Sequence, residues 1–175
     1  MRVLSLFDGI GTGRFVLDQL GIPVEAYYAS EIDEKALQVS SRHYPDIVQL
    51  GDVNKIDFTA LPKIDLLLGG SPCQDVSIAG KREGLGGARS GLYKKYIEAF
   101  EILKPTYFLL ENTKMKKEYM DTISADLGVK PVELDSSYFS ATSRKRLYWF
   151  NFDLTQEVPN VTTTVEDILE PEKDV

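Results

Sequence analysis

The segment RVLSLFDGIGTG, residues 2–13, decides the fold class of this 175-residue chain. Its first five residues form a short, mainly apolar run of the kind found in buried strands. The glycines that follow allow a tight strand-to-helix turn, through which a ligand can approach the bare backbone. Arg14 stands where the dinucleotide fingerprint G-x-G-x-x-G, counted from Gly9, has its third glycine, so the loop instead indicates a nucleoside cofactor. A turn that binds no ligand is the alternative.

The rest of the chain alternates short apolar segments with longer amphipathic ones, which is typical of parallel strands joined by crossover helices. The sequence therefore predicts an α/β domain with a seven-stranded, mostly parallel sheet and helices on both faces. Strands are expected at residues 2–6, 24–30, 47–50, 64–68, 107–110, 129–135 and 147–152. Helices are expected at residues 12–20, 34–43, 92–103 and 116–127, whereas the connection at residues 54–61 is too short for a full helix.

Length and composition limit the classes of protein to which this chain can belong. With 43% hydrophobic and 27% charged residues, the chain is expected to form one soluble domain rather than to be disordered. No apolar run reaches the length of a membrane helix and no signal peptide is evident, so we expect a cytoplasmic protein without a membrane partner. The single cysteine, Cys73, and the single histidine, His43, exclude an internal disulfide and a Cys/His zinc site, and no metal is expected.

The charge of the chain is unevenly distributed. The net charge of −7 argues against a protein that coats nucleic acid non-specifically. Residues 153–175 carry −6 of it, whereas residues 1–152 carry only −1 and residues 80–95 carry a local +4. The sequence thus combines a nearly neutral core, a basic loop and an acidic C-terminal extension.

Two carboxylates are expected close to the glycine loop. Glu31 ends the second predicted strand and Asp52 follows the third, and the carboxyl ends of neighbouring parallel strands line one crevice. Carboxylates there can accept hydrogen bonds from ribose hydroxyls and from an adenine amino group. The alternative is that Glu31 caps the next helix, but Asp33 can supply that cap by itself.

The fourth predicted strand leads into GGSPCQ, residues 69–74, at the sheet edge where catalytic groups collect in this architecture. A lone cysteine is by default a small buried hydrophobe. Pro72 stiffens the approach to Cys73, however, and three cations follow within residues 81–89. Their positive field could favour the thiolate that acts as a nucleophile.

The fifth predicted strand ends at Leu110, before Glu111, where burial of the carboxyl group would raise its pKa and suit it to general acid chemistry. Capping of the next helix explains Asn112 and Thr113 but leaves Glu111 unexplained. Arg144 and Arg146 share one face if their segment is extended, and two guanidinium groups there suit a phosphate or a base carbonyl. A solvated basic edge is the alternative for the arginines.

Taken in order, these motifs resemble those of the cytosine-5 DNA methyltransferases that use S-adenosylmethionine. The resemblance covers residues 2–152 and rests on Phe7 to Gly13, Glu31, Gly51 to Val53, Gly70 to Gln74, Arg89 to Leu92, Glu111 to Thr113 and Arg144 to Arg146. The segment RKRLYW, residues 144–149, is most similar to the branch with animal de novo methyltransferases and some bacterial and phage enzymes. The resemblance implies a Rossmann-like methyltransferase fold, S-adenosylmethionine as cofactor, DNA as partner, and a bacterial or phage-encoded protein.

The resemblance also implies roles for individual residues. The cofactor would be held by Phe7, Asp8, Gly9, Ile10, Gly11, Thr12, Glu31, Ile32, Asp52, Val53 and Leu92. In this set Phe7 packs on the adenine, residues 8–12 hold the methionine part and Glu31 holds the ribose. Ile32, Asp52 and Val53 contact the adenine, and Leu92 helps to close the pocket.

The implied catalytic residues are Cys73, Glu111, Arg144 and Arg146. Cys73 would attack C6 of a cytosine that has been flipped out of the duplex. Glu111 would hydrogen-bond the ring N3 and the amino group, and the two arginines would position the base and the backbone. Thr113 and Thr142 depart from the valine and glutamine that are common in the family.

The family continues beyond its arginine motif into a target-recognition region and a last segment that completes the cofactor pocket. We therefore expect residues 1–152 to be a catalytic core without that region, and residues 153–175 to be an acidic extension at its start. A second polypeptide could supply the missing region. Besides this enzyme, whole or split, two functions stay open: a non-catalytic methyltransferase-like partner, against which Cys73 and Glu111 argue, and a transfer-RNA cytosine-5 methyltransferase. The target sequence and the biological role, such as restriction-modification, are also open.

Overall fold

In the computed structural model, which describes residues 1–70 and 91–153 together with residues 164 and 167, the strands form one mixed sheet. Within these residues the sheet has seven strands in the order β3-β2-β1-β4-β5-β7-β6. The strands are β1 (Arg2–Leu6), β2 (Ala26–Ser30), β3 (Val48–Gln49), β4 (Leu66–Gly69), β5 (Tyr107–Thr113), β6 (Val132–Asp135) and β7 (Lys145–Phe150). Neighbours pair in parallel except at β7, which is antiparallel to both β5 and β6. The predicted seven-stranded, mostly parallel sheet is confirmed.

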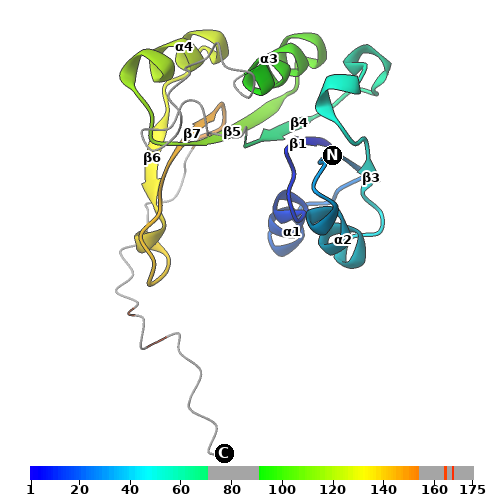
Figure 1. Cartoon of the computed structure of the whole chain (residues 1–175), viewed down its shortest axis with the longest axis horizontal. Coiled ribbons are helices and arrows are strands. Elements are labelled where there is room, and N and C mark those ends of the chain that lie inside the picture. The colour runs from blue at the N-terminus through cyan, green and yellow to red at the C-terminus, as the bar shows by residue number, and fades with distance from the viewer. Residues whose placement is uncertain (71–90, 154–163, 165–166, 168–175) are drawn as a thin grey trace, which may run out of the picture.

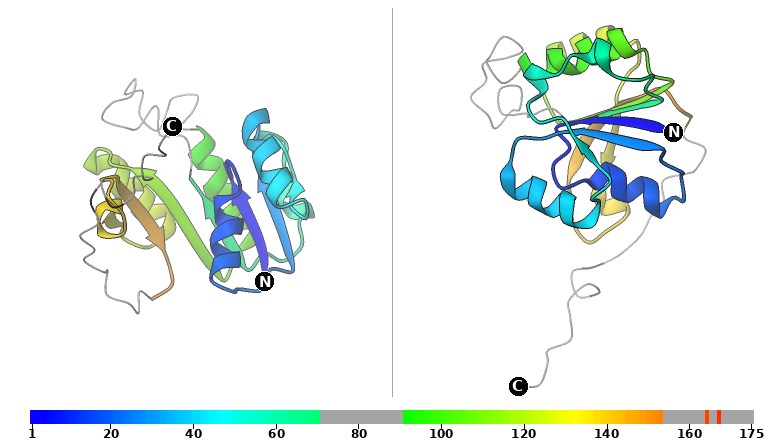
Figure 2. Two further views of the ribbon diagram at one scale, coloured as in Figure 1. Left: turned by 90° about the horizontal axis from the view of Figure 1, so that it is seen from below. Right: turned by 90° about the vertical axis from the view of Figure 1, so that its right-hand side faces the viewer.

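Helices cover both faces of the sheet, as Figure 1 shows. The α-helices of the described residues are α1 (Thr12–Gln19), α2 (Glu34–His43), α3 (Gly91–Leu103) and α4 (Lys117–Leu127). Helices α1 and α2 lie on one face and α3 and α4 on the other, and the views in Figure 2 show the same two layers. Between β3 and β4 the chain forms only the 3₁₀ turns η1 (Val53–Lys55) and η2 (Phe58–Ala60), which agrees with the expectation that this connection is too short for a full helix.

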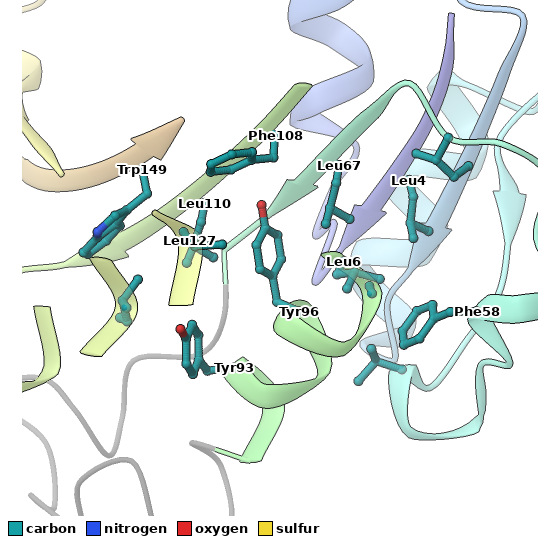
Figure 3. Packing of buried hydrophobic residues seen from close by; sticks show 14 of the residues in the cluster. Leu4, Leu6, Phe58, Leu67, Tyr93, Tyr96, Phe108, Leu110, Leu127 and Trp149 are labelled. Carbon is teal, nitrogen blue, oxygen red and sulfur yellow. The ribbon is translucent and has the colours of Figure 1, made fainter. Parts of the chain in front are cut away.

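Both faces of the central strands are buried, which explains why these strands are uniformly apolar. Successive side chains of a strand point to opposite faces. In β1, accordingly, Val3 belongs to the cluster beneath α1 and α2, whereas Leu4 belongs to the larger cluster beneath α3 and α4. Figure 3 shows the larger cluster, in which Tyr93 and Tyr96 of α3 reach toward the sheet. This packing fixes α3 beside the carboxyl end of β4.

The order of the strands reverses between β1 and β4. From β1 the chain proceeds outward through β2 to β3, and from β4 it proceeds in the other direction to β5. Ligands of open α/β sheets bind at such a switch point, outside the carboxyl ends of the strands. The glycine loop follows β1 and residues 69–74 begin at the end of β4, so both motifs start at this place.

Strand β5 is longer than the sequence predicts. We expected it to end at Leu110, but it continues through Thr113 because β7 pairs with it up to Arg146. Asn112 is therefore a buried strand residue, with 2% of its surface exposed, and not a helix cap. Helix α4 begins later, with Lys116 at the cap position, so the capping interpretation of Asn112 and Thr113 is wrong.

Candidate active site

The glycine loop is a strained turn that is tied to the neighbouring strand. Phe7 has a positive φ of 60°, which is unusual for a residue with a side chain, and Gly9 and Gly11 have φ of 63° and 86°. The Asp8 amide donates to the Ser30 carbonyl at the end of β2 (3.1 Å). Gly11 then precedes α1 in a left-handed conformation. The loop therefore keeps its shape at the carboxyl ends of β1 and β2.

Glu31 holds this loop with its carboxylate. One oxygen accepts a hydrogen bond from the Gly9 amide (2.8 Å), and the other accepts from the amides of Ile32 (2.8 Å) and Asp33 (2.9 Å). The cap of α2 comes from Asp33, which accepts from two amides of the first turn, as predicted. Glu31 is thus free of the capping role and organises the predicted cofactor loop.

Asp8 has an unusual environment for a carboxylate. Its Oδ1 accepts a hydrogen bond from the Tyr27 hydroxyl (2.7 Å), whereas Oδ2 is buried and has no hydrogen-bond partner among the described residues. Burial raises the pKa of Asp8, and the nearby charge of Glu31 raises it further. The sequence reasoning missed Tyr27, since a tyrosine in an apolar strand carries no signal of a polar partner. An unpaired carboxylate oxygen beside a glycine loop is an acceptor that a cationic amino group can use.

The remaining predicted cofactor residues differ in exposure. Ile10 and Ile32 are 55% and 71% exposed, whereas Val53 is buried in the core. Asp52 accepts from the backbone amide of Asn54 (2.9 Å), and this hydrogen bond lowers the pKa of Asp52. The last two members, Phe7 and Leu92, pack half-buried against the larger cluster. Val53 is buried as a whole residue, with 4% of its surface exposed, so its contact with the adenine stays a prediction.

Glu111 and Arg146 form an ion pair across β5 and β7. Nε of Arg146 lies 2.9 Å from Oε1 of Glu111, with side chains 21% and 33% exposed respectively. Burial raises the pKa of Glu111, although the charges of Arg146 and then Arg144 lower it in part. The structure thus brings Arg146 to Glu111, and Arg144 is near enough for its charge to act on the same carboxyl group.

The end of β4 lies directly beside Glu111. A Cβ atom at Gly70 would be 3.3 Å from Oε2 of Glu111. Cys73 follows Gly70 by three positions, but Cys73 and the basic loop around Arg89 lie outside the described residues. The structure therefore brings the Glu111 carboxyl group to the start of the segment that carries the predicted nucleophile.

The packing of α3 against β4 is a further feature that sequence reasoning missed. A Cβ atom at Gly69 would lie 2.5 Å from a ring carbon of Tyr96, so only glycine fits there. The Tyr96 hydroxyl is buried and has no hydrogen-bond partner in the part of the chain that the structure describes. Gly69 and Gly70 thus each allow a close approach: the Tyr96 ring lies against Gly69, and the Glu111 carboxyl group lies against Gly70.

Comparison with known proteins identifies the family. A model of the C-5 cytosine-specific DNA methylase family matches residues 1–174. The chain belongs to this family. It is 41% identical over 116 residues to the orphan methyltransferase M.Rho11sI of Bacillus phage rho11s, a match that covers 65% of this chain and 23% of the relative. It is 41% identical over 140 residues to the type II methyltransferase M2.BsuMI of Bacillus subtilis strain 168, covering 73% and 35%.

Solved structures support the fold. A putative DNA modification methyltransferase encoded within an Escherichia coli prophage matches with a TM-score of 0.77 and 22% identity, over 100% of this chain and 56% of that one. The Schizosaccharomyces pombe Dnmt2 methyltransferase matches with a TM-score of 0.65 and 20% identity, over 95% and 54%. The predicted Rossmann-like methyltransferase fold is therefore confirmed. The chain spans about a quarter to a third of the length of the two curated relatives above.

Two further properties concern the described residues alone. No helix among them is long and apolar enough to cross a membrane. Nor do these residues bring together three or more His, Cys, Asp or Glu side chains that could hold a metal ion.

Proposed function

We propose that residues 1–152 are the catalytic core of an enzyme that methylates C5 of cytosine in DNA, with S-adenosylmethionine as donor. One observation carries the proposal: Glu111, paired with Arg146, lies against Gly70 at the sheet edge where the glycine loop also begins. Family membership favours DNA over the transfer-RNA alternative. The non-catalytic alternative leaves the ion-paired Glu111 without a purpose.

The residues at the switch point suit S-adenosylmethionine. Oδ2 of Asp8 can accept a hydrogen bond from the amino group of the methionine part, while Tyr27 holds the other oxygen of this carboxylate. A Cβ atom at Gly9 or Gly51 would meet no atom within 4 Å, so the backbone is open to a ligand at both positions. Glu31 lies between these glycines in the sequence and fixes the loop. When bound, the cofactor supplies an electrophilic methyl group on a sulfonium.

In the proposed reaction the Cys73 thiolate adds to C6 of an extruded cytosine, which makes C5 nucleophilic. Glu111 has a raised pKa and in its protonated form can donate a hydrogen bond to N3, where negative charge develops. Arg146 holds the Glu111 carboxyl group in place, and Arg144 adds positive charge beside the base. After methylation, loss of the C5 proton to a water-derived base returns the electrons that expel the thiolate.

Covalent trapping tests this proposal. Duplex DNA with 5-fluorocytosine should form a lasting adduct with Cys73 when S-adenosylmethionine and any missing partner polypeptide are supplied, because fluorine cannot leave as the proton does. Mass spectrometry detects the adduct even if turnover is slow. Cys73→Ser should abolish the adduct, whereas the control change Ser41→Ala, at an exposed position of α2, should keep it. An equally stable adduct in Cys73→Ser would place the nucleophile elsewhere.

We further propose that target recognition requires polypeptide beyond residues 1–152. The core carries a charge of only −1 and residues 153–175 carry −6, so long-range attraction to DNA is weak. The chain also spans a minor part of the two curated relatives. Slow or undetectable methylation of mixed-sequence DNA by residues 1–175 alone is the expected result. Rapid, site-specific methylation would contradict it.

A further inference from the structure

The connection between β6 and β7, residues 136–144, exposes two adjacent aromatic rings. Tyr138 and Phe139 are 42% and 54% exposed, although large apolar side chains are normally buried. Their ring centroids are 6.5 Å apart and their planes are nearly perpendicular, at 86°. Figure 1 shows that this connection projects beyond the sheet, on the side of α1 and α2. The rings are thus presented outward and do not fill the core.

The backbone around these rings is held firmly. Oδ1 of Asp135 accepts hydrogen bonds from the amides of Ser137 (3.1 Å) and Arg144 (2.9 Å), and Oδ2 accepts from the hydroxyl of Ser143 (2.9 Å). The Phe139 amide donates to the Ser136 carbonyl (2.9 Å). The exposure of the rings is therefore a property of an ordered turn, and a ligand would find them preorganised.

The charge beside the rings is positive. Residues 136–146 contain Arg144, Lys145 and Arg146 and no acidic residue. Arg146 is engaged with Glu111, and Lys145 is an exposed residue at the start of β7. The strand register places Arg146 opposite Thr113, so the turn stands at the same sheet edge as Glu111. Aromatic rings beside cations on a surface are the combination that binds accessible nucleic-acid bases and their phosphates.

We propose that Phe139 stacks on a DNA base close to the extruded cytosine, while Tyr138 braces the ring and Lys145 contacts a phosphate. This inference rests on the proposed function, because extrusion of a base is what exposes its neighbours in a duplex. Phe139 is the more exposed ring and only one of two perpendicular rings can stack on a given base. Neither Tyr138 nor Phe139 is among the residues on which the resemblance to the family was based.

The test is the affinity of the chain for fluorescently labelled, single-stranded DNA of mixed sequence, measured by fluorescence anisotropy. The salt concentration is varied from about 20 to about 150 mM, a range over which the Debye length shortens and exposed charges become more strongly screened. Phe139→Leu keeps apolar area but loses the stacking face, and it should weaken binding about five- to 100-fold at every salt concentration. Phe139→Trp should retain or improve binding. Lys145→Gln should instead reduce the slope of log affinity against log salt concentration by about 1, the amount expected for the loss of one phosphate contact.

The matched control is Tyr107→Leu. Tyr107 is 43% exposed, close to the value for Tyr138, but it begins β5 and so lies at the opposite edge of the sheet. This change should leave DNA binding unaltered. Equal affinities of wild type and Phe139→Leu, an equal loss in Tyr107→Leu, or at least tenfold tighter binding of RNA of the same sequence would overturn the proposal.

The two proposals can fail separately. If the wild type forms the 5-fluorocytosine adduct but Phe139→Leu binds DNA normally, the stacking role is wrong and the enzyme assignment stands. If binding depends on Phe139 but no adduct forms, the stacking role stands and the catalytic assignment fails.

Discussion

Replacement of either of two α3 tyrosines by phenylalanine should change the free energy of unfolding, but in opposite directions. Tyr96 and Tyr93 are 0% and 5% exposed and belong to one cluster (Figure 3). Within residues 1–70 and 91–153 the Tyr96 hydroxyl has no hydrogen-bond partner, and burial raises its pKa well above the ordinary value. The Tyr93 hydroxyl instead donates to Oδ2 of Asp126 on α4 (2.7 Å). Replacement by phenylalanine removes only the hydroxyl in each case.

The expected magnitudes follow from these partners. A buried polar group without a hydrogen bond costs about 1–3 kcal/mol, so Tyr96→Phe should raise the free energy of unfolding by about 1–2 kcal/mol after a small loss of packing. Tyr93→Phe should lower it by about 1 kcal/mol because a net favourable hydrogen bond is lost. For a chain of this size the melting temperature changes by about 2–4 °C per kcal/mol. The two variants should therefore melt on opposite sides of the wild type.

Urea unfolding followed by tryptophan fluorescence measures the effect. Trp149 is the single tryptophan of the chain and is fully buried, so its emission reports unfolding of the core. The slope of the unfolding free energy against urea should be the same in all three proteins. A lower midpoint for Tyr96→Phe, or the same sign of change in both variants, would refute the assignment of an unpaired hydroxyl in this core.

Three further predictions concern the site. Tyr27→Phe should weaken S-adenosylmethionine binding several-fold in calorimetry, since Asp8 loses the hydroxyl that donates to its Oδ1; unchanged affinity would contradict this. Burial raises the pKa of Asp8, and only the ionised form can accept from the amino group. As the pH is lowered, affinity for S-adenosylmethionine should therefore begin to fall at a higher pH than it would with an aspartate of ordinary pKa, and Asp8→Asn should remove this pH dependence. Glu111→Gln should slow single-turnover methyl transfer at least ~100-fold with cofactor affinity intact, and a rate near that of wild type would exclude Glu111 as the acid.

The elements fixed by local sequence were predictable. The glycine loop, the Asp33 cap and α2 depend on residues that are close in the chain, so periodicity and cap chemistry were sufficient to find them. The reversed direction of β7 and its place between β5 and β6 depend on pairing between distant segments. For that reason the sequence did not reveal the added length of β5 or the burial of Asn112.

The partners of the site residues were the least predictable feature. Tyr27 is 19 positions from Asp8, and Tyr96 is 27 positions from the glycine that its ring contacts. In the sequence, both tyrosines lie within segments predicted to be a strand or a helix, and nothing there indicates their partners. Motifs indicated the proposed active-site groups, but the side chains that hold them in place are far away in the sequence and are found only in the folded sheet.

The two halves of the site consequently have different origins. The glycine-loop part of the proposed cofactor site is built within the first 31 residues, because β1, its loop and the end of β2 supply Asp8, Tyr27 and Glu31, whereas Asp52 and Leu92 come from later elements. The proposed catalytic half requires β7 to return antiparallel beside β5, so that Arg146 reaches Glu111 from the position opposite Thr113. The same return places the exposed turn of Phe139 at that edge. The antiparallel strand β7 thus brings two features to the end of β4, where the segment with Cys73 begins. One is Arg146, which pairs with Glu111, and the other is Phe139, the proposed base-stacking ring.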